Sequence, residues 1–187
     1  MFVFSELKGK YEVKDGGLCF KDYPSFYISS VDSSFLNQIY LYYYEQKSIV
    51  LGRFTFDIVK IEPVENLVYN NNHEYIIQTI SPVCCYKTDE KRYITYFHPK
   101  SQDFEMSIRD NLERKLKILG MDTSQEFFEI LEVIREKKVR VKFKRMVIQS
   151  YNVRMKIRVS NEYLKMMMHT GMGARNSGGF GMIQIIK

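Results

Sequence analysis

The sequence has no tryptophan, four prolines and three cysteines among its 187 residues. Two of the cysteines, Cys84 and Cys85, are adjacent, so the chain lacks both a disulfide framework and a Cys-x-x-Cys zinc site. Its apolar runs are far too short to span a bilayer. The first residues, Met1 to Glu6, lack the basic and apolar regions of a signal peptide. These absences predict a reduced, cytoplasmic protein with no membrane partner.

Acidic residues are scarce in one segment, which explains the charge of the whole chain. Between Arg135 and Arg158 there are ten lysines and arginines and one acidic residue, Glu136. The chain as a whole carries a formal charge of +6, so this segment holds all the excess positive charge. A concentrated basic segment is typical of a protein that binds a polyanion, and nucleic acid is the first candidate.

Two parts of this basic segment alternate between apolar and basic side chains. Paired antiparallel, they predict a hairpin with one apolar and one strongly basic face. The alternative is an ordinary solvated sheet face with lysines that protect an edge. The alternation contains no acidic partners, so we favour a surface that follows the phosphates of a nucleic acid. Its predicted contacts are Arg140, Lys142, Lys144, Arg145, Arg154, Lys156 and Arg158.

Glycine is concentrated near the C-terminus, where five of the ten glycines lie between Gly171 and Gly181. A helix is expected before this segment and a strand after it, whereas dinucleotide loops and P-loops need the opposite order. The backbone N–H groups and Arg175 would suit a phosphate, while a glycine-capped turn is the alternative. Five glycines exceed what a turn needs, so we predict ligand contacts at Gly171, Gly173, Arg175, Asn176, Ser177, Gly178 and Gly179.

The order of expected elements predicts an α+β fold of tandem ferredoxin-like (RNA-recognition-type) domains. In the second half, the sequence favours strands at 74–81, 139–144, 153–159 and 182–186, and helices at 101–119, 124–135 and 161–169. This is a β-α-β-β-α-β arrangement. The first half, with strands at 2–7, 24–29 and 53–61 and a helix at 31–46, lacks the opening strand and helix. We expect domains at 1–66 and 67–187.

Four motifs resemble those of a known family. Gly171-Met-Gly-Ala-Arg-Asn-Ser-Gly-Gly-Phe-Gly-Met-Ile183 resembles the C-terminal glycine-rich signature of the CRISPR-associated repeat-cleaving endoribonucleases. This is the Cas six family of the repeat-associated mysterious protein superfamily. Phe2-Val-Phe-Ser5 is similar to its Phe-Thr-Phe-Ser strand, Ser81-Pro82-Val83 to its Ser-Pro opening of the second domain, and Asn111-Leu-x-x-Lys115 to its long-helix motif.

The resemblance implies a function and a set of partners. The family binds the repeat RNA of a CRISPR precursor transcript (pre-crRNA) and cleaves it without a metal or cofactor. A 2′-hydroxyl attacks the adjacent phosphate and leaves a 2′,3′-cyclic phosphate, which needs a general base, a general acid and nearby cations. The resemblance is also compatible with a homodimer or with other CRISPR-associated effector subunits as partners.

The resemblance leaves the catalytic residues of this chain unknown. In the family, the usual catalytic histidine lies upstream of the Phe-Thr-Phe-Ser strand, whereas this sequence begins at the matching strand. It therefore implies a chain that lacks the N-terminal strand and helix. Two candidates remain, His169 beside the glycine segment and His98 before Pro99. For His169 the alternative is a helix C-terminal histidine interacting with the dipole, and His73 is expected to be solvated.

Three other functions stay open. A non-catalytic RNA-binding homologue, or an effector-complex subunit, would share the fold and the basic face. An ordinary RNA-recognition module is partly mimicked by Gly179-Phe-Gly181, but the following positions lack the aromatic residues for stacking. An enzyme for small phosphorylated substrates would use the glycine segment but would not explain the basic hairpin.

Overall fold

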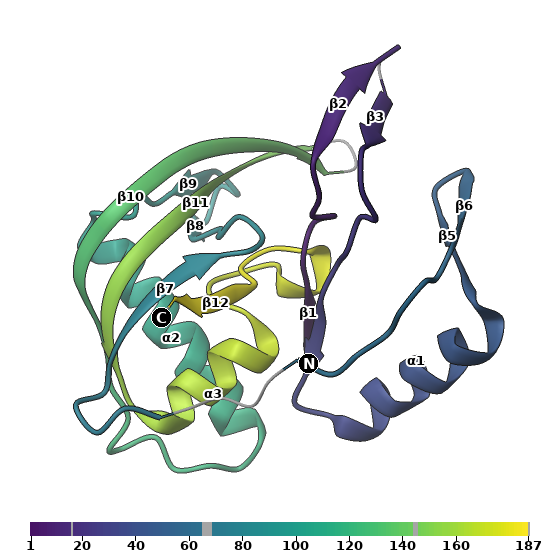
Figure 1. Cartoon of the computed structure of the whole chain (residues 1–187). Helices are drawn as coiled ribbons and strands as arrows, with labels where there is room; N and C mark the ends of the chain where they lie inside the picture. The colour runs from purple at the N-terminus through teal and green to yellow at the C-terminus, as the bar shows by residue number, and fades with distance from the viewer. Residues whose placement is uncertain (16, 65–68, 144–145, 187) are drawn as a thin grey trace.

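The computed structural model describes residues 1–15, 17–64, 69–143 and 146–186 (Figure 1). Its first half contains β1 (Phe2–Phe4), β2 (Tyr11–Lys14), β3 (Gly17–Phe20), β4 (Ile28–Ser30), α1 (Ser33–Gln46), β5 (Ser48–Leu51) and β6 (Phe54–Asp57). The second half contains β7 (Glu74–Thr79), β8 (Tyr86–Thr88), β9 (Ile94–Tyr96), α2 (Gln102–Ile118), β10 (Phe128–Phe143), β11 (Met146–Val159), α3 (Asn161–Thr170), a 3-10 turn η1 (Asn176–Gly178) and β12 (Ile183–Ile186).

The second half forms one antiparallel four-stranded sheet in the order β10-β11-β7-β12. Along the chain the main elements run β7, α2, β10, β11, α3, β12, which is the predicted β-α-β-β-α-β arrangement. The ferredoxin-like prediction for this half is confirmed. Figure 1 shows β10 and β11 as two long, strongly curved strands that extend well beyond the rest of the sheet.

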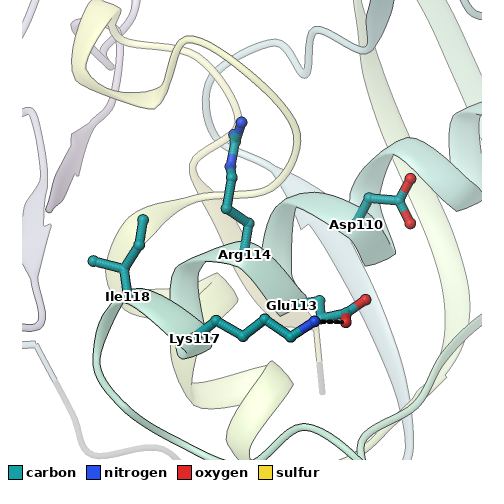
Figure 2. A pocket seen from close by; sticks show the side chains of 5 residues that line it. All are labelled: Asp110, Glu113, Arg114, Lys117 and Ile118. Atoms are coloured by element: carbon teal, nitrogen blue, oxygen red, sulfur yellow. Dashed lines mark hydrogen bonds and ion pairs between the residues drawn. The ribbon is translucent and has the colours of Figure 1, made fainter.

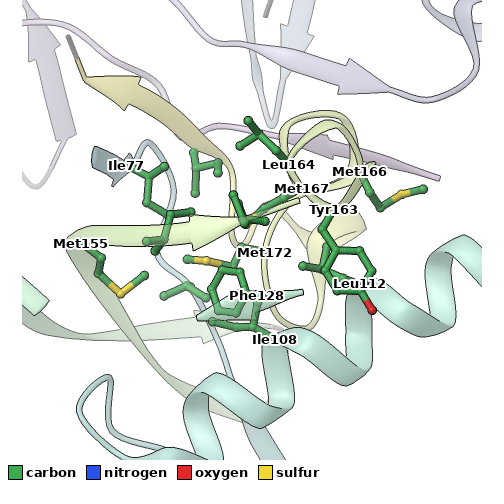
Figure 3. Close-up of a cluster of buried hydrophobic side chains, with 14 of the residues drawn as sticks. Ile77, Ile108, Leu112, Phe128, Met155, Tyr163, Leu164, Met166, Met167 and Met172 are labelled. Atoms are coloured by element: carbon green, nitrogen blue, oxygen red, sulfur yellow. The ribbon is translucent and has the colours of Figure 1, made fainter. Parts of the chain in front are cut away.

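The main core lies between this sheet and the two helices α2 and α3. Alternate strand residues such as Ile77 and Met155 are fully buried against Ile108 and Leu112 of α2 and Leu164 of α3 (Figure 3). The strands supply this core with a two-residue period and the helices with an i, i+4 stripe, so both patterns face one interior. Each fully buried aliphatic side chain contributes roughly 1.5–3 kcal/mol to folding.

One predicted helix is wrong. The sequence favoured a helix from Ser124 to Arg135, but β10 begins at Phe128 and runs through that region. Its register with β11 shifts twice, between Ile130 and Glu132 and again between Val133 and Arg135. These bulges gave apolar residues a spacing that imitates a helix, whereas pairing with β11 stabilises the strand. At the first bulge, the Ile130 N–H donates to Glu105 Oε2 on α2 at 2.8 Å.

The first half is less tightly built. β1 pairs with β4, and β2–β3 and β5–β6 form separate antiparallel hairpins. Helix α1 begins as predicted, with Asp32 accepting hydrogen bonds from the backbone of Ser34 and Phe35. No residue of α1 is buried in the described structure.

The two halves meet at β1, which lies beside η1 in Figure 1. The predicted domain boundary at residue 66 lies outside the described residues. No helix in the described parts of the chain is long and apolar enough to cross a membrane. The contact between β1 and the C-terminal segment brings two of the four sequence motifs together.

Candidate nucleic-acid interface

The glycine loop, residues 171–181, connects α3 to the final strand through an unusual backbone. Gly171, Gly173, Gly179 and Gly181 all have positive φ angles, between 72° and 84°. Arg175 also has a positive φ, 61°, which is costly for a residue with a Cβ atom. The positive φ angle alone is therefore enough to favour glycine at positions 171, 173, 179 and 181.

The glycines also allow the loop to pack closely against its surroundings. A Cβ atom on Gly181 would lie 1.9 Å from the Met172 carbonyl oxygen, and one on Gly173 would lie 2.7 Å from the Cys84 carbonyl oxygen. Gly171 and Gly173 are buried. The excess of glycines that predicted ligand contact is thus explained by packing within the protein, and Gly171 and Gly173 lie inside it.

Many backbone N–H groups of the glycine loop donate to other parts of the protein. The N–H of Met172 donates to Gly181 O at 2.7 Å, that of Ala174 to Cys84 O at 2.8 Å, and that of Gly181 to Pro82 O at 2.9 Å. The N–H groups of Gly178 and Gly179 donate to carbonyls in the same turn. The predicted run of donors for a phosphate is therefore largely used to hold the loop itself.

A buried lysine of α2 stabilises the glycine loop through hydrogen bonds. The Lys115 ammonium donates to Gly171 O and Asn176 Oδ1, both at 2.8 Å, and to Thr170 O at 3.3 Å. The Asn176 amide nitrogen donates in turn to the carbonyls of Met172 and Phe180. Burial lowers the Lys115 pKa to about 7, with a smaller effect from Arg114. In the sequence, Lys115 stood out only as part of a motif, because its contacts lie far along the chain.

Arg175 is the cation that the glycine loop presents. Its guanidinium carbon lies 5.2 Å from the centre of the Tyr86 ring on β8, and Tyr86 faces Tyr96 of β9 at 5.8 Å. The buried Arg175 Nε has no hydrogen-bond partner within the described residues. An arginine held over an aromatic ring with a vacant donor is well suited to a phosphate or a stacked base. Ser177, two residues on, is exposed.

The basic hairpin, formed by β10 and β11, is antiparallel as predicted, but its basic residues do not share one face. Arg140 pairs with Gln149, and Lys142 pairs with Val147. Side chains alternate between the two faces of a strand. The side chains of Arg140 and Lys142 therefore lie on one face of the hairpin, and those of Arg154, Lys156 and Arg158 lie on the other. The prediction of a single basic face is wrong. Lys144 and Arg145 lie outside the described residues.

Two of the basic side chains also have acidic partners. Lys156 Nζ lies 2.7 Å from Glu74 Oε2, and Arg158 lies 3.4 Å from Glu129 and 3.9 Å from Glu74. The hydrogen bond from Lys156 is the main cause that lowers the Glu74 pKa. The prediction that this face has no acidic partners is wrong, because those partners come from β7 and from the region misassigned as a helix.

His169 lies where α3 approaches the first half. Its Nδ1 is 3.3 Å from the Ser29 hydroxyl of β4, and Gly171 is two residues further along. Partial burial, and then the charge of Lys165, lower the His169 pKa. The imidazole is therefore neutral at pH 7, as a general base must be before it takes a proton.

His98 is more fully engaged by the protein. Its Nδ1 accepts from the Lys100 N–H at 3.3 Å, and its Nε2 lies 3.3 Å from Glu136 Oε1. The ring edge packs on Tyr151. His73, predicted as a solvated residue, instead packs its ring against Phe127. Within the described structure, neither of these histidines forms a hydrogen bond, ion pair or ring contact with the glycine loop.

Two surface pockets are lined by residues outside the glycine loop. One, of about 440 Å³, is lined by acidic, basic and apolar side chains of α2: Asp110, Glu113, Arg114, Lys117 and Ile118 (Figure 2). Lys117 and Glu113 form an ion pair there. The other, of about 410 Å³, lies between the start of α2 and β10. Among the described residues, no three His, Cys, Asp or Glu side chains gather as metal ligands. These pockets give no support to a small-molecule enzyme built on the loop.

Comparison with solved structures shows the same fold over the whole chain. A structure described as the characterization of a Cas6-related gene from Pyrococcus furiosus superposes with a TM-score of 0.88 at 23% identity, covering 100% of this chain and 78% of that one. An RAMP protein binding different RNA substrates gives a TM-score of 0.84 at 21% identity, with 100% and 79% covered. A CRISPR associated protein Cas6 gives 0.83 at 22%, with 100% and 78% covered.

The sequence itself matches one family model. No curated protein matches the chain. Residues 60–185 match the model described as CRISPR associated protein Cas6, C-terminal, which is well over half of the sequence. The match includes β7 to β11, the helices α2 and α3, and the glycine loop. The chain therefore belongs to the Cas6 family of CRISPR-associated proteins.

Proposed function

We propose that this chain binds CRISPR repeat RNA and takes part in processing the precursor transcript. The observation that carries this proposal is that the family match spans both the basic hairpin and the glycine loop. The structural neighbour described as an RAMP protein binding different RNA substrates agrees with it. The excess positive charge lies in the same matched region, and phosphate contacts supply most of the affinity of such proteins.

The proposed RNA contacts fall into three groups. The glycine loop offers Arg175, Ser177 and the outer side of Gly178 and Gly179. The distal part of the basic hairpin offers Arg140 and Lys142, with Lys144 and Arg145 following in the sequence. The sheet offers Arg154, Lys156 and Arg158. Gly171, Gly173 and Asn176 act through the loop, since they are held by packing and by Lys115.

We further propose metal-independent cleavage. A general base accepts the proton of the 2′-hydroxyl, the 2′-oxygen attacks the adjacent phosphorus, and the bond to the 5′-oxygen breaks as that oxygen gains a proton. The products are a 2′,3′-cyclic phosphate and a 5′-hydroxyl. His169 is the candidate base, because its lowered pKa leaves it neutral at pH 7 beside the glycine loop. Cations near the phosphate stabilise the developing charge.

The alternative is a non-catalytic RNA-binding homologue or effector-complex subunit. Three contacts favour it, because both ring nitrogens of His98 and the Nδ1 of His169 already face protein groups. In that case other effector subunits, or a second copy of the chain, would be the protein partners. Under both proposals we place the domains at 1–66 and 67–187 and the activity in the cytoplasm.

The test is to incubate the purified chain with labelled repeat RNA in EDTA and to score retardation and cleavage on separate gels. We expect retardation, and cleavage to a cyclic-phosphate end that is lost in His169→Ala. Binding without cleavage would support the non-catalytic alternative. Cleavage that persists in both His169→Ala and His98→Ala would exclude both candidates. No binding would overturn the proposed function.

A further inference from the structure

A straight row of four polar side chains crosses the face of the C-terminal sheet that is turned away from α2 and α3. Arg135 of β10 lies opposite Arg154 of β11, Arg154 lies opposite Gln78 of β7, and Gln78 lies opposite Gln184 of β12. Residues directly opposite one another in an antiparallel sheet point to the same side. The row therefore places two guanidinium groups and two amides in line across all four strands.

The two arginines are an unfavourable pair for a protein surface without a ligand. Like charges directly opposite each other on neighbouring strands destabilise a sheet. No ion pair joins either arginine to a carboxylate within the described residues, although acids neutralise the neighbouring row at Lys156 and Arg158. The Arg154 Nε is also buried without a hydrogen-bond partner among the described residues. The carboxylates of Glu74 and Glu129 therefore contact Lys156 and Arg158, and not the two arginines of the row.

The neighbouring positions explain why this face is not a conventional stacking platform. The central strands present Glu74, Ile76 and Gln78 on β7 beside Arg158, Lys156 and Arg154 on β11. None of these six is aromatic, so bases are not bound here by stacking on rings. What the row offers is a concentrated positive charge followed by amide groups, each of which both donates and accepts hydrogen bonds.

We propose that this row binds one nucleotide of single-stranded RNA, with its phosphate between Arg135 and Arg154 and its base edge against Gln78 and Gln184. Arginine pairs hold phosphate oxygens through charge-assisted hydrogen bonds. Glutamine amides read the donor and acceptor groups on the edge of an unstacked base. Outer strands of a four-stranded sheet lie roughly 14 Å apart, which accommodates a phosphate and its base side by side. This inference rests on the proposed function and adds Arg135, Gln78 and Gln184 to it.

The experiment measures binding of labelled single-stranded repeat RNA by fluorescence anisotropy at several salt concentrations. Arg135→Ala should weaken binding by about tenfold. It should also reduce the slope of log affinity against log salt concentration by about one unit, the value for one lost phosphate contact. Gln78→Ala should keep the slope but reduce the difference in affinity between homopolymer probes of the four bases. Arg109→Ala, an exposed arginine on α2, is the matched control and should leave affinity unchanged.

Thermal unfolding separates a binding role from a structural one. Arg135→Ala should leave Tm unchanged or raise it, because it removes the repulsion from Arg154. A fall in Tm that accompanies the loss of affinity would overturn the inference, since the arginines would then support the fold. Unchanged affinity and salt slope in Arg135→Ala, with a wild-type chain that binds RNA, would overturn this inference alone. A wild-type chain that does not bind would overturn the proposed function as well.

Discussion

The glycine loop and the basic hairpin both belong to the proposed RNA interface, yet they are built in opposite ways. In the glycine loop, backbone groups pack against one another and against Lys115, and Arg175 is the charged side chain that it offers. In the basic hairpin the backbone forms an antiparallel ladder with two bulges, and the cations extend from both of its faces. The glycine loop therefore depends on internal contacts, whereas the hairpin depends on exposed charge.

This difference determines which property a substitution changes. A change inside the glycine loop alters the fold first and RNA binding as a consequence. A change on the hairpin should alter the proposed RNA binding with little effect on folding, because exposed side chains contribute little to stability. Stability and affinity measured on the same variants should therefore separate the two regions.

The largest effect should come from Gly181→Ala. The added Cβ meets the Met172 carbonyl oxygen at 1.9 Å and requires a φ of 78°. We expect the free energy of unfolding to fall by about 3–5 kcal/mol. Gly52→Ala is the matched control, because Gly52 has a φ of 65° but nothing within 4 Å of the new atom, so it should cost about 1 kcal/mol. Equal losses in chemical denaturation would show that packing in the loop is unimportant.

Lys115→Met should have an intermediate effect. It removes the donor to Thr170 O, Gly171 O and Asn176 Oδ1, and unpaired buried acceptors should lower stability by about 2 kcal/mol at pH 7. Lys117→Met, on the exposed side of α2, is the control and should change stability by less than about 0.5 kcal/mol.

The same lysine gives a pH dependence with a definite sign. The Lys115 pKa is lowered from 10.5 to about 7 in the folded chain. Between these values the unfolded chain binds the extra proton, so the lysine's contribution to stability rises with pH over this window and is constant below it. Denaturation at several pH values should show this rise in the wild-type chain and a smaller one in Lys115→Met. Identical profiles would contradict the burial-lowered pKa.

The smallest effect should distinguish free from paired cations on the hairpin. Lys142→Ala should reduce the salt slope of RNA binding by about one unit per lost phosphate contact. Arg158→Ala should reduce it by less, because Glu129 and Glu74 already lie 3.4 and 3.9 Å from that side chain. Both variants should unfold within about 0.5 kcal/mol of the wild-type chain. A larger slope change for Arg158→Ala would show that RNA displaces the acids.

The sequence predicted the second half well where local patterns determine structure. The helix predicted at 101–119 is α2, with Ser101 as its N-cap, and the alternation around Val153 and Ile157 predicted β11 and its buried face. The family signature located the glycine loop. Each of these signals is contained in a few neighbouring residues, so no knowledge of distant contacts was needed.

The errors arose where distant residues decide the structure. The bulges near Ile130 imitate a helical spacing, and the pairing of Arg140 with Gln149 sets which face a cation occupies. The role of Lys115 depends on Asn176, 61 positions away. The alignment of Arg135, Arg154, Gln78 and Gln184 follows from the registers of three strand pairs. None of these relations can be predicted from the sequence close to any one of the residues involved.

The packing of β1 against the glycine loop limits the substitutions that the two segments can accept. A Cβ atom on Gly171 would lie 2.9 Å from Val3, and one on Gly179 would lie 2.8 Å from Phe4. Both glycines also need a positive φ, so a smaller side chain on β1 does not make another residue acceptable in the loop. We therefore expect apolar substitutions at Val3 and Phe4 to be tolerated more readily than any substitution at Gly171 or Gly179.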